Sequence, residues 1–301
     1  SVTLSDPRGV FAIADSVGPR ALSPGESVEV QIRFVPAAER VYSGSIHVVS
    51  TSSNGSYRRI ALRGMGGAGT LVPPGVVSGV WSKALSPYTV TGDIEVPAGQ
   101  TLTVEPGVAV KFAGHFRLTA GRDATLRAVG TEDDPIRFTA IDCLEGWFGI
   151  RFVDAGDDDV LQYCHLEGAR KPYATSTGPA NLVGGAVACY RTPARGAHGV
   201  ASAPVSSPTI DHCRFSDNHA ESGGAIACWD GSQAVISNNT LVDNMADWEG
   251  GGIYVYDAAP TIANNILAAN AAYWGGGVYS DYSRPRIINN TVVRNRPSGL
   301  H

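Results

Sequence analysis

Short apolar runs recur at a regular spacing along the C-terminal part of the chain. Four isoleucines carry the repeat at intervals of 26, 26 and 25 residues: Ile210, Ile236, Ile262 and Ile287. Two series of asparagines keep the same register, namely Asn218, Asn244, Asn270 and Asn295, and Asn239, Asn265 and Asn290. Each unit also contains a glycine cluster followed by another apolar run, so the chain is built from a repeat of 25–26 residues.

The apolar runs within a unit have the character of strands. They are three to five residues long, often β-branched, and separated by Gly, Asn and Pro. A helical repeat needs about 33 residues for its two helices, so this unit is too short for one. Three short parallel strands with three turns fit the length. The sequence therefore predicts an all-β fold, a right-handed parallel β-helix (a solenoid), whose hand follows from the crossover preference of parallel strands.

The repeat continues toward the N-terminus with looser spacing. Residues 184–190 and 223–229 have closely similar sequences. Earlier runs of strand character, which indicate narrower coils, occur at Thr101–Val104, Val108–Phe112, Ala124–Ala128 and Pro135–Thr139. Two insertions rich in Pro, Ala, Ser and Gly, at about 168–182 and 191–207, are expected to loop out of the stack. We expect the β-helix to span residues 67–301.

Residues 1–66 have a different pattern. Ser27–Phe34 alternates polar and apolar residues, and shorter runs follow at Tyr42–Val49 and Arg58–Leu62. Such alternation predicts antiparallel strands with one polar face, as in a partial β-sandwich. The glycine-rich segment Gly64–Gly69 is expected to be a flexible joint between this domain and the β-helix.

Composition and charge exclude several classes of protein. The net charge of −5 argues against a nucleic-acid partner, which would require a basic face. No apolar run reaches the roughly 18 residues of a membrane span. Five cysteines without a C-x-x-C spacing fit neither a disulfide framework nor a zinc site.

The repeated asparagines and cysteines have structural explanations. Identical asparagines in stacked coils, about 4.8 Å apart, hydrogen-bond to one another along the stack. We therefore expect two asparagine ladders. Two cysteine pairs are expected to stack as buried free thiols: Cys164 over Cys213, and Cys189 over Cys228.

The N-terminal motifs resemble a known bacterial domain. Leu22-Ser23-Pro24-Gly25, Phe34-Val35-Pro36 and Tyr42-Ser43-Gly44 resemble the second half of an immunoglobulin-like domain of the choice-of-anchor type. The first strands of such a domain are not matched. Because these domains are common in large bacterial surface proteins, the resemblance implies an extracellular or cell-surface location.

The remainder of the chain also carries a resemblance. With motifs such as Pro97-Ala98-Gly99-Gln100 and Glu105-Pro106-Gly107-Val108, residues 70–301 resemble the right-handed parallel β-helix superfamily, which includes pectate-lyase-like proteins. The Gly-Gly-Ala-Ile element and Phe215-Ser216-Asp217-Asn218 are similar to repeats of polymorphic outer-membrane proteins of bacteria. Many members of the superfamily are polysaccharide lyases or hydrolases.

The strand after each glycine cluster supplies the ligand-binding candidates. Alternation points one set of its side chains outward. This set forms an aromatic strip, which we define as Tyr190, Trp229, Tyr254, Tyr256, Tyr279 and Asp281. Aromatic rows on a rigid sheet suit stacking against sugar rings, and an exposed patch of this kind indicates a binding surface. Alternatively, the insertions at 168–182 and 191–207 cover the strip.

Catalytic and metal-binding candidates are few. Asp230 and Asp257, one coil apart beside Arg191, suit a glycoside hydrolase if their carboxylates are about 5–5.5 Å apart. A polysaccharide lyase instead needs a base and a cation. The Gly-His-Gly signature of the superfamily's hydrolases is absent, which favours a non-catalytic protein. One acidic turn is a candidate calcium site or simply a solvated turn; its residues are Asp154, Asp157, Asp158 and Asp159. No other cofactor is expected.

Together these features predict a secreted bacterial surface module for adhesion, glycan binding or assembly, with a polysaccharide or cell-surface glycan as partner. The alternative is a polysaccharide lyase or glycoside hydrolase that acts on the aromatic face. Self-association is also expected, through an unpaired sheet edge or an open end of the β-helix, since either accepts a strand from a neighbour.

Overall fold

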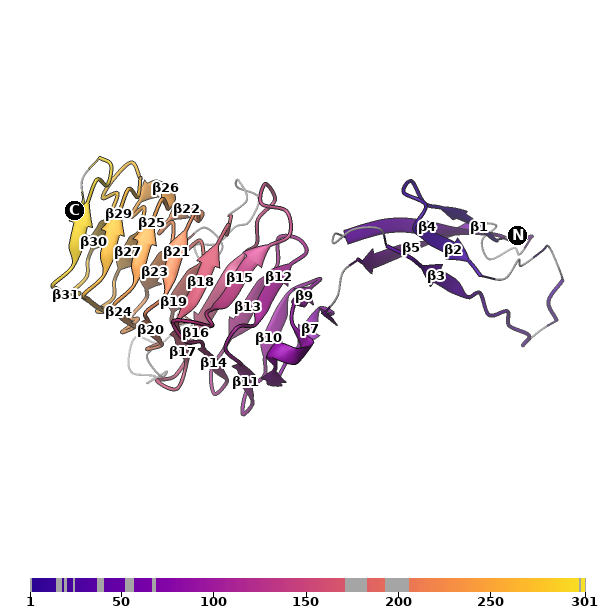
Figure 1. The fold of residues 1–301 in the computed structure, drawn as a ribbon, viewed down its shortest axis with the longest axis horizontal. Helices are drawn as coiled ribbons and strands as arrows, with labels where there is room; N and C mark the ends of the chain where they lie inside the picture. The colour runs from indigo at the N-terminus through magenta and orange to yellow at the C-terminus, as the bar shows by residue number, and fades with distance from the viewer. Residues whose placement is uncertain are drawn as a thin grey trace. The chain divides into compact units, whose positions relative to one another are not determined.

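The computed structural model describes residues 2–14, 18, 21–23, 25–36, 41–51, 57–66, 69–170, 183–192, 206–297 and 299–300. The chain divides into two compact units, Ser1–Ala68 and Gly69–His301, which are traced in Figure 1. Each unit has its own core, and each is described by itself below.

The N-terminal unit is antiparallel. Its three-stranded sheet has the order β1-β4-β5, and its two-stranded sheet pairs β2 with β3. The strands are β1 Val2–Ser5, β2 Phe11–Ile13, β3 Ile32–Phe34, β4 Val41–Val49 and β5 Tyr57–Met65. The rings of Phe11 and Phe34 stack 4.8 Å apart in a small core with Tyr42. Only the last three residues of the strand predicted at Ser27–Phe34 form one, and the immunoglobulin-like assignment stays a prediction.

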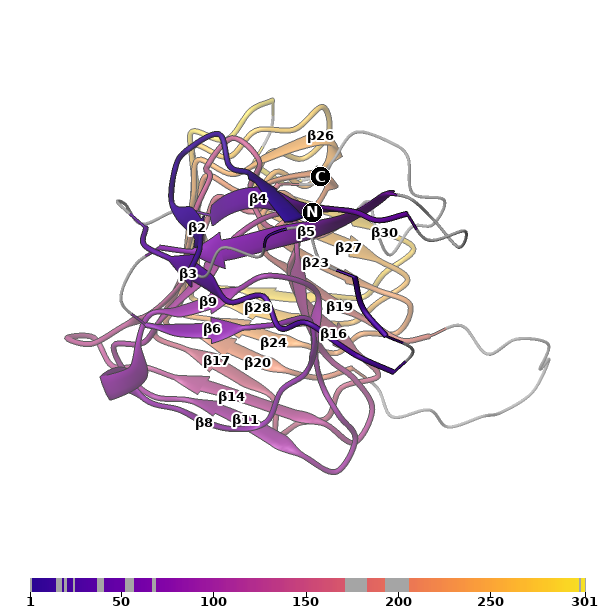
Figure 2. The ribbon, with the colours of Figure 1, turned by 90° about the vertical axis from the view of Figure 1, so that its right-hand side faces the viewer.

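The second unit is a parallel β-helix with three sheets, and each coil passes from sheet 3 to sheet 1 and then to sheet 2. The stacked coils are seen from the side in Figure 1 and along the stack in Figure 2. Sheet 1 contains β7 Gly75–Val76, β10 Ile94–Val96, β13 Arg117–Ala120, β16 Gly149–Val153, β19 Val187–Tyr190, β23 Ile226–Trp229, β27 Ile253–Tyr256 and β30 Val278–Asp281.

The other two long sheets complete the coils. Sheet 2 contains β8 Gly79–Trp81, β11 Thr101–Val104, β14 Thr125–Val129, β17 Val160–Gln162, β20 Thr209–Asp211, β24 Val235–Ser237, β28 Thr261–Ala263 and β31 Arg286–Ile288. Sheet 3 contains β6 Thr70–Val72, β9 Tyr88–Val90, β12 Ala109–Phe112, β15 Ile136–Ala140, β18 Cys164–Glu167, β21 Arg214–Ser216, β25 Thr240–Val242, β29 Ile266–Ala268 and β32 Thr291–Val293. The remaining elements are η1 Lys83–Leu85 and the pair β22 His219–Ser222 and β26 Met245–Glu249.

The interior is filled by matching positions of successive coils. In sheet 1, one buried aliphatic residue from each coil pairs with the next: Leu118, Ile150, Val187, Ile226, Ile253 and Val278. In an N-terminal coil, the buried rings of Phe112 and Trp147 stack 4.6 Å apart inside the β-helix. Burial of each such side chain contributes about 1.5–3 kcal/mol. Because one coil buries these residues only against its neighbours, the stack stabilises itself.

Both predicted asparagine ladders are present. Asn244 shows the pattern: its Oδ1 accepts from the backbone N–H and from Nδ2 of Asn218, and its Nδ2 donates to Oδ1 of Asn270 at 2.9 Å. The residue before each ladder position has a left-handed backbone, as at Asp217 and Asp243, which turns the next side chain inward. The ladder therefore satisfies the buried polar groups of each turn, which would each cost about 1–3 kcal/mol if unpaired.

Two cysteines continue the second ladder where asparagine is missing. The backbone N–H of Cys164 donates to Sγ of Cys213, and the backbone N–H of Cys213 donates to Oδ1 of Asn239. Each thiol also donates to a carbonyl of the preceding coil, as the asparagine amides do. Cys189 pairs in register with Cys228, and all four thiols are buried and free. The predicted stacking is confirmed.

The glycine clusters form the corner that leads into sheet 1. Gly223 and Gly275 have φ of +70° and +56°, in the left-handed region. A Cβ atom on Gly223 would lie 2.6 Å from the backbone oxygen of Ile226, and one on Gly275 would lie 2.6 Å from that of Val278. Glycine is therefore required here both for its backbone conformation and for the close approach of the chain.

Candidate functional site

The residues of the aromatic strip lie on the outer face of sheet 1, as the alternation predicts. Tyr190, Trp229, Tyr256 and Asp281 pair in one row, and Tyr254 and Tyr279 pair in the row beside it. Ala188 and Ala227 continue the second row. These alanines and Trp229 form a cluster of their own, separate from the interior core.

The rings of the strip stack on one another along the β-helix. The centroids of Tyr190 and Trp229 are 4.2 Å apart with an angle of 11° between the rings, and those of Tyr254 and Tyr279 are 6.0 Å apart at 10°. Faces used in this way are not available for a sugar ring. Trp229 is also only 5% exposed, whereas Tyr256 is 39% exposed. The part of the strip that reaches solvent is therefore its C-terminal end.

The two insertions that the sequence predicts as a cover for the strip fall largely in residues 171–182 and 193–205, outside the described residues. Within the described part of the chain, Val183 packs against the cluster of Ala188, Ala227 and Trp229. Burial also raises the pKa of Tyr190. The N-terminal half of the strip is thus a packed region of the molecule.

Further exposed aromatic residues lie on the coils of β27 and β30. Trp248, Tyr273 and Trp274 are about half exposed, with edge-to-face contacts from Trp248 to Tyr273 and from Tyr273 to Trp274. They precede the two strands, and Tyr282 follows β30 and packs edge-on against Tyr256. We define the aromatic band as Trp248, Tyr254, Tyr256, Tyr273, Trp274, Tyr279 and Tyr282.

Glu249 lies near residues of the aromatic band both before and within sheet 1. Its backbone pairs with that of Trp274, and its charge raises the pKa of both Tyr254 and Tyr279, although burial raises each of them more. The band therefore runs along the strand direction across two coils, whereas the sequence predicted a strip running from coil to coil. The 26-residue interval between Trp248 and Trp274 is the signal in the sequence for this part of the surface.

The three catalytic candidates come together at the corner after sheet 1. Asp230 and Asp257 both have left-handed backbones, and the N–H of Gly231 donates to the carbonyl oxygen of Asp257 at 2.7 Å. The guanidinium of Arg191 lies beside Gly231, 3.5 Å from the position of a Cβ there. Burial and the nearby Asp257 carboxylate raise the pKa of Asp230, while Arg191 opposes the rise. This is the environment of a carboxyl group that retains its proton to a higher pH.

The acidic turn at residues 154–159 distributes its carboxylates among different partners. Asp154 accepts from Arg122 and from the hydroxyl and N–H of Thr192. Asp159 accepts backbone hydrogen bonds from Leu126 and Gly156, yet burial raises its pKa to about 6. No group of three or more His, Cys, Asp or Glu side chains among the described residues is arranged to hold a metal ion. Calcium binding at Asp154, Asp157, Asp158 and Asp159 stays a prediction.

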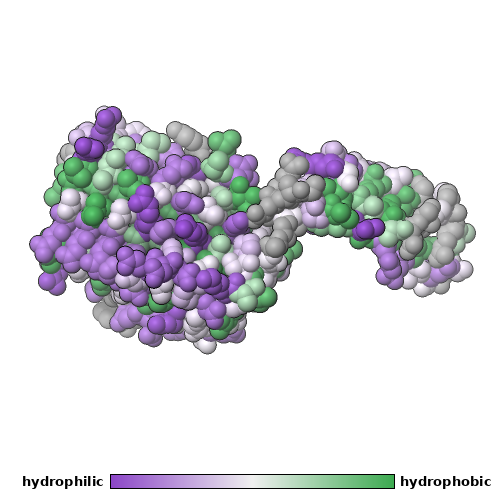
Figure 3. Space-filling model, in the orientation of Figure 1, coloured by the Kyte–Doolittle hydropathy of each residue, from purple (hydrophilic) through white to green (hydrophobic). Residues whose placement is uncertain are grey.

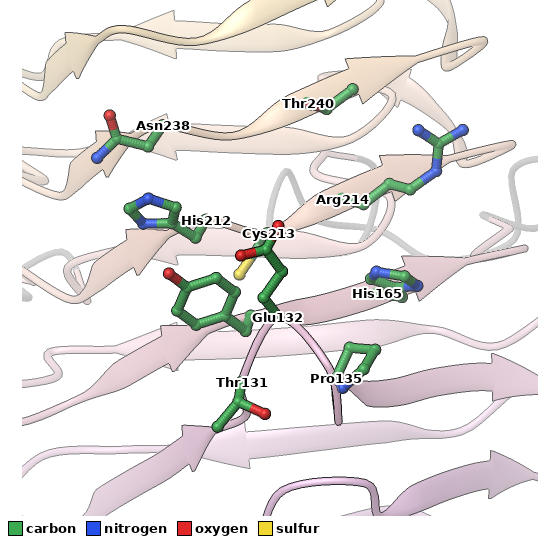
Figure 4. A pocket seen from close by; sticks show the side chains of 10 residues that line it. Thr131, Glu132, Pro135, His165, His212, Cys213, Arg214, Asn238 and Thr240 are labelled. Atoms are coloured by element: carbon green, nitrogen blue, oxygen red, sulfur yellow. The ribbon is translucent and has the colours of Figure 1, made fainter.

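A hollow lies on another side of the β-helix, at the turn from sheet 2 into sheet 3. Its volume is about 460 Å³. Figure 4 shows His165 and Arg214 at one side of the hollow, His212 at the other, and Glu132 reaching between them from the loop before β15. Tyr163, whose ring stacks on that of His212, also lines the hollow. The remaining lining residues are Thr131, Pro135, Cys213, Asn238 and Thr240. None of these residues was a candidate from the sequence.

The comparison with known families agrees with this architecture. A family model described as "Right handed beta helix region" matches residues 187–301. The match covers the C-terminal coils and agrees with the parallel β-helix that they form. No curated protein and no solved structure matches the chain.

The matched β-helix region contains the whole aromatic band, the corner of Asp230 and Asp257, and half of the hollow. In Figure 3, hydrophobic residues gather on one part of the C-terminal coils, and a largely hydrophilic area lies beside them. Exposed aliphatic residues there include Ile266, Ile287 and Val293. Among the described residues, no helix has the length and apolar character required to cross a bilayer.

Proposed function

We propose that this β-helix is a glycan-binding module that uses the aromatic band as its contact surface and performs no reaction. The observation that carries the proposal is the exposure of five residues of the band: from 39% at Tyr256 to 79% at Tyr282, with Trp248, Tyr273 and Trp274 between these values. Tyr254 and Tyr279 are less exposed and pack beside them. Large aromatic side chains exposed together on a rigid sheet indicate a contact surface.

The chemistry beside the aromatic band also suits a carbohydrate. Tyrosine and tryptophan combine an apolar ring with a polar atom, so they pack against the C–H face of a sugar and still hydrogen-bond. Glu249 and Asp281 lie beside the tyrosines and supply carboxylate oxygens that accept from sugar hydroxyls. A row of such contacts along the strand direction suits an extended chain of several sugars.

The proposal places the module outside a bacterial cell, at its surface, in an adhesive role. It is supported by the resemblance of the N-terminal segment to domains of bacterial surface proteins. A glycan on a cell or in a matrix would be the partner of the aromatic band.

Binding to a panel of polysaccharides tests the proposal. We expect Tyr256→Ala and Trp274→Ala each to weaken binding about tenfold, because each removes a contact worth about 1.4 kcal/mol. Tyr57→Ala is the matched control, since Tyr57 is an exposed tyrosine of the N-terminal unit. Circular dichroism and the melting temperature verify folding. Absence of binding to every polysaccharide, or equal binding by all variants, would contradict the proposal.

One observation favours a second candidate, glycoside hydrolysis at the corner of Asp230 and Asp257. The raised pKa of Asp230 suits a proton donor, and Asp257 is the neighbouring carboxylate that would serve as nucleophile or base. A reducing-end assay on the same panel tests it, with loss of product expected for Asp230→Asn and Asp257→Asn. Unsaturated products would instead indicate a lyase. If no new ends form with any polysaccharide, the non-catalytic function stands.

A further inference from the structure

A column of basic side chains from three successive coils runs past the hollow, and two of its members, His165 and Arg214, line the hollow in Figure 4. Arg137 of β15 pairs in register with His165 of β18, which pairs with Arg214 of β21. Neighbouring strands lie about 4.8 Å apart, so the two guanidinium groups flank one imidazole on the outer face of sheet 3. Nη1 of Arg137 is 3.3 Å from Nδ1 of His165.

The positive charge of this column is not balanced by an ion pair. In the part of the chain that the structure describes, neither Arg137 nor Arg214 has a carboxylate oxygen within 4.0 Å. The positive charge of the column acts on His165. The pKa of His165 is lowered most by burial and then by Arg137 and Arg214, whereas Glu167 raises it. The two guanidinium groups lie on either side of His165, so an anion placed between them would be attracted by both.

The half-buried carboxylate of Asp211, beside His212, already has hydrogen-bond partners. Asp211 accepts from Nδ1 of His212 at 2.7 Å, and from Gln162, Ser237 and Asn238. Burial alone would raise the pKa of Asp211, but these four hydrogen bonds lower it to about 2. Asp211 thus fixes the ring of His212 and stays ionised, and its oxygens point to these donors.

The second wall of the hollow is an aromatic pair. The rings of Tyr163 and His212 stack 4.8 Å apart at 26°, and both residues have left-handed backbones at the same turn of successive coils. Glu132 is exposed and extends over the hollow from the loop before β15. A ligand in the hollow would meet basic groups at one side and a ring surface at the other, with one carboxylate above.

We propose that the basic column at the edge of this hollow is an oxyanion-binding site, in which Arg137 and Arg214 hold a carboxylate, sulfate or phosphate group of the ligand across His165. Guanidinium groups present their N–H donors in a planar fork that matches the oxygens of such groups, and charge-assisted hydrogen bonds are the strongest of their kind. The site is independent of the aromatic band and of the function proposed for it.

The site has a defined dependence on pH. The ionisable groups that face His165 are Arg137 on β15, Glu167 on β18, Arg214 on β21, Glu132 from the loop, and the pair Asp211 and His212 at the turn. Protonation of His165 adds a third cation beside the anion. Because both arginines oppose that protonation, affinity should increase only as the pH falls below the ordinary histidine value of about 6.5, and the bound anion should raise the pKa of His165.

Titration of the full chain with inorganic sulfate, inorganic phosphate and glucuronate tests the proposal, by calorimetry and by the ring resonances of His165. We expect Arg137→Gln and Arg214→Gln each to weaken binding about tenfold at an ionic strength of about 0.15 M. Arg286→Gln is the matched control, an exposed arginine of sheet 2. Glu132→Gln should strengthen binding, because it removes the carboxylate above the hollow.

The three probes distinguish the sources of the anion. Binding of sulfate or phosphate alone assigns the site to an ester group, and binding of glucuronate alone assigns it to a sugar acid. The proposal is overturned if none of the three binds, if the control variant loses as much affinity as Arg214→Gln, or if the His165 resonances do not move. Because the substituted side chains are on the outer face, melting temperatures close to that of the parent are expected for all variants.

Discussion

Arg151 is a buried charged side chain that has no carboxylate within 4.0 Å in the part of the chain that the structure describes. It lies on the outer face of sheet 1 in register with Ala188, yet it is only 1% exposed. Its Nη1 and Nη2 donate to the carbonyl oxygens of Ile150 and Phe148, and its guanidinium lies 5.0 Å from the centroid of the Phe148 ring. Among the described residues, its Nε is the one buried side-chain nitrogen or oxygen without a hydrogen bond.

We expect Arg151→Met to leave the free energy of unfolding unchanged or to raise it by about 1–4 kcal/mol. Burial lowers the pKa of Arg151 to about 10, so the group is still charged at neutral pH, and an apolar side chain of similar length removes this desolvation cost. Denaturant unfolding measures the change. Arg117→Met is the control, because Arg117 is partly exposed and pairs with Asp93, so its loss should cost no more than about 1 kcal/mol. A large destabilisation by Arg151→Met would show that this cation has a stabilising partner.

The asparagine ladder is the element that links one coil to the next. Asn244 donates to the carbonyl oxygens of Phe215 and Val242 as well as to Asn270, and all of these contacts are inside the turn. The cysteines at the N-terminal end of the second ladder make fewer and weaker bonds of the same type. The ladder therefore tolerates a weaker hydrogen-bonding group at its end, where one neighbouring coil has no asparagine at the same position.

Asn244→Leu should lower the free energy of unfolding by about 3 kcal/mol or more, because it leaves the N–H of Asn218 and the carbonyl of Phe215 buried and unpaired. Thermal and denaturant melts measure the loss. Gln233→Leu is the matched amide-to-leucine control on an exposed position, where a change within about 0.5 kcal/mol is expected. Equal effects of the two substitutions would mean that the ladder contributes little.

At the scale of the whole molecule, the β-helix behaves as a stack of interchangeable coils. Thr240 of one coil pairs with Ile266 of the next, and Asn239 pairs through its side chain with Asn265. Excision of residues 240–265 therefore joins Asn239 to Ile266 with the strand register and both ladders intact. We expect the shortened chain to keep its β-sheet circular dichroism and to unfold cooperatively with a lower unfolding enthalpy.

Excision of residues 240–262 is the control for this experiment. It removes three residues fewer, so the ladder asparagines and interior residues of the following coils no longer align with those before the cut. We expect that chain to aggregate or to lose its C-terminal coils. If both shortened chains fold equally well, in-register stacking is not what specifies the coils.

Much of the fold was predictable, because a β-helix places residues of the same role at the same interval. The predicted strand at Thr101–Val104 matches β11, and the apolar run predicted after each glycine cluster forms a strand of sheet 1. The prediction was weaker in the N-terminal unit, where the alternation in Ser27–Phe34 extends beyond the three residues that pair. Alternation describes which side chains face a core, but strand length there depends on a partner strand distant in sequence.

The candidate sites were predicted in part. The outward orientation of Tyr254 and Tyr256 follows from alternation alone. The exposure of these two tyrosines does not follow from alternation, because it depends on how the rings of neighbouring coils stack and on what else covers the sheet. Trp229 has the same outward orientation and is nearly buried.

The sequence by itself determined the repeat, the parallel β-helix and the positions that face inward or outward, since each depends on local periodicity. Only the tertiary structure decided which surfaces are open and which charges meet. Arg137, His165 and Arg214 are neighbours in register, yet they are 28 and 49 residues apart in the chain. Coils of unequal length hide such a column from any fixed period, so the fold alone brings it together.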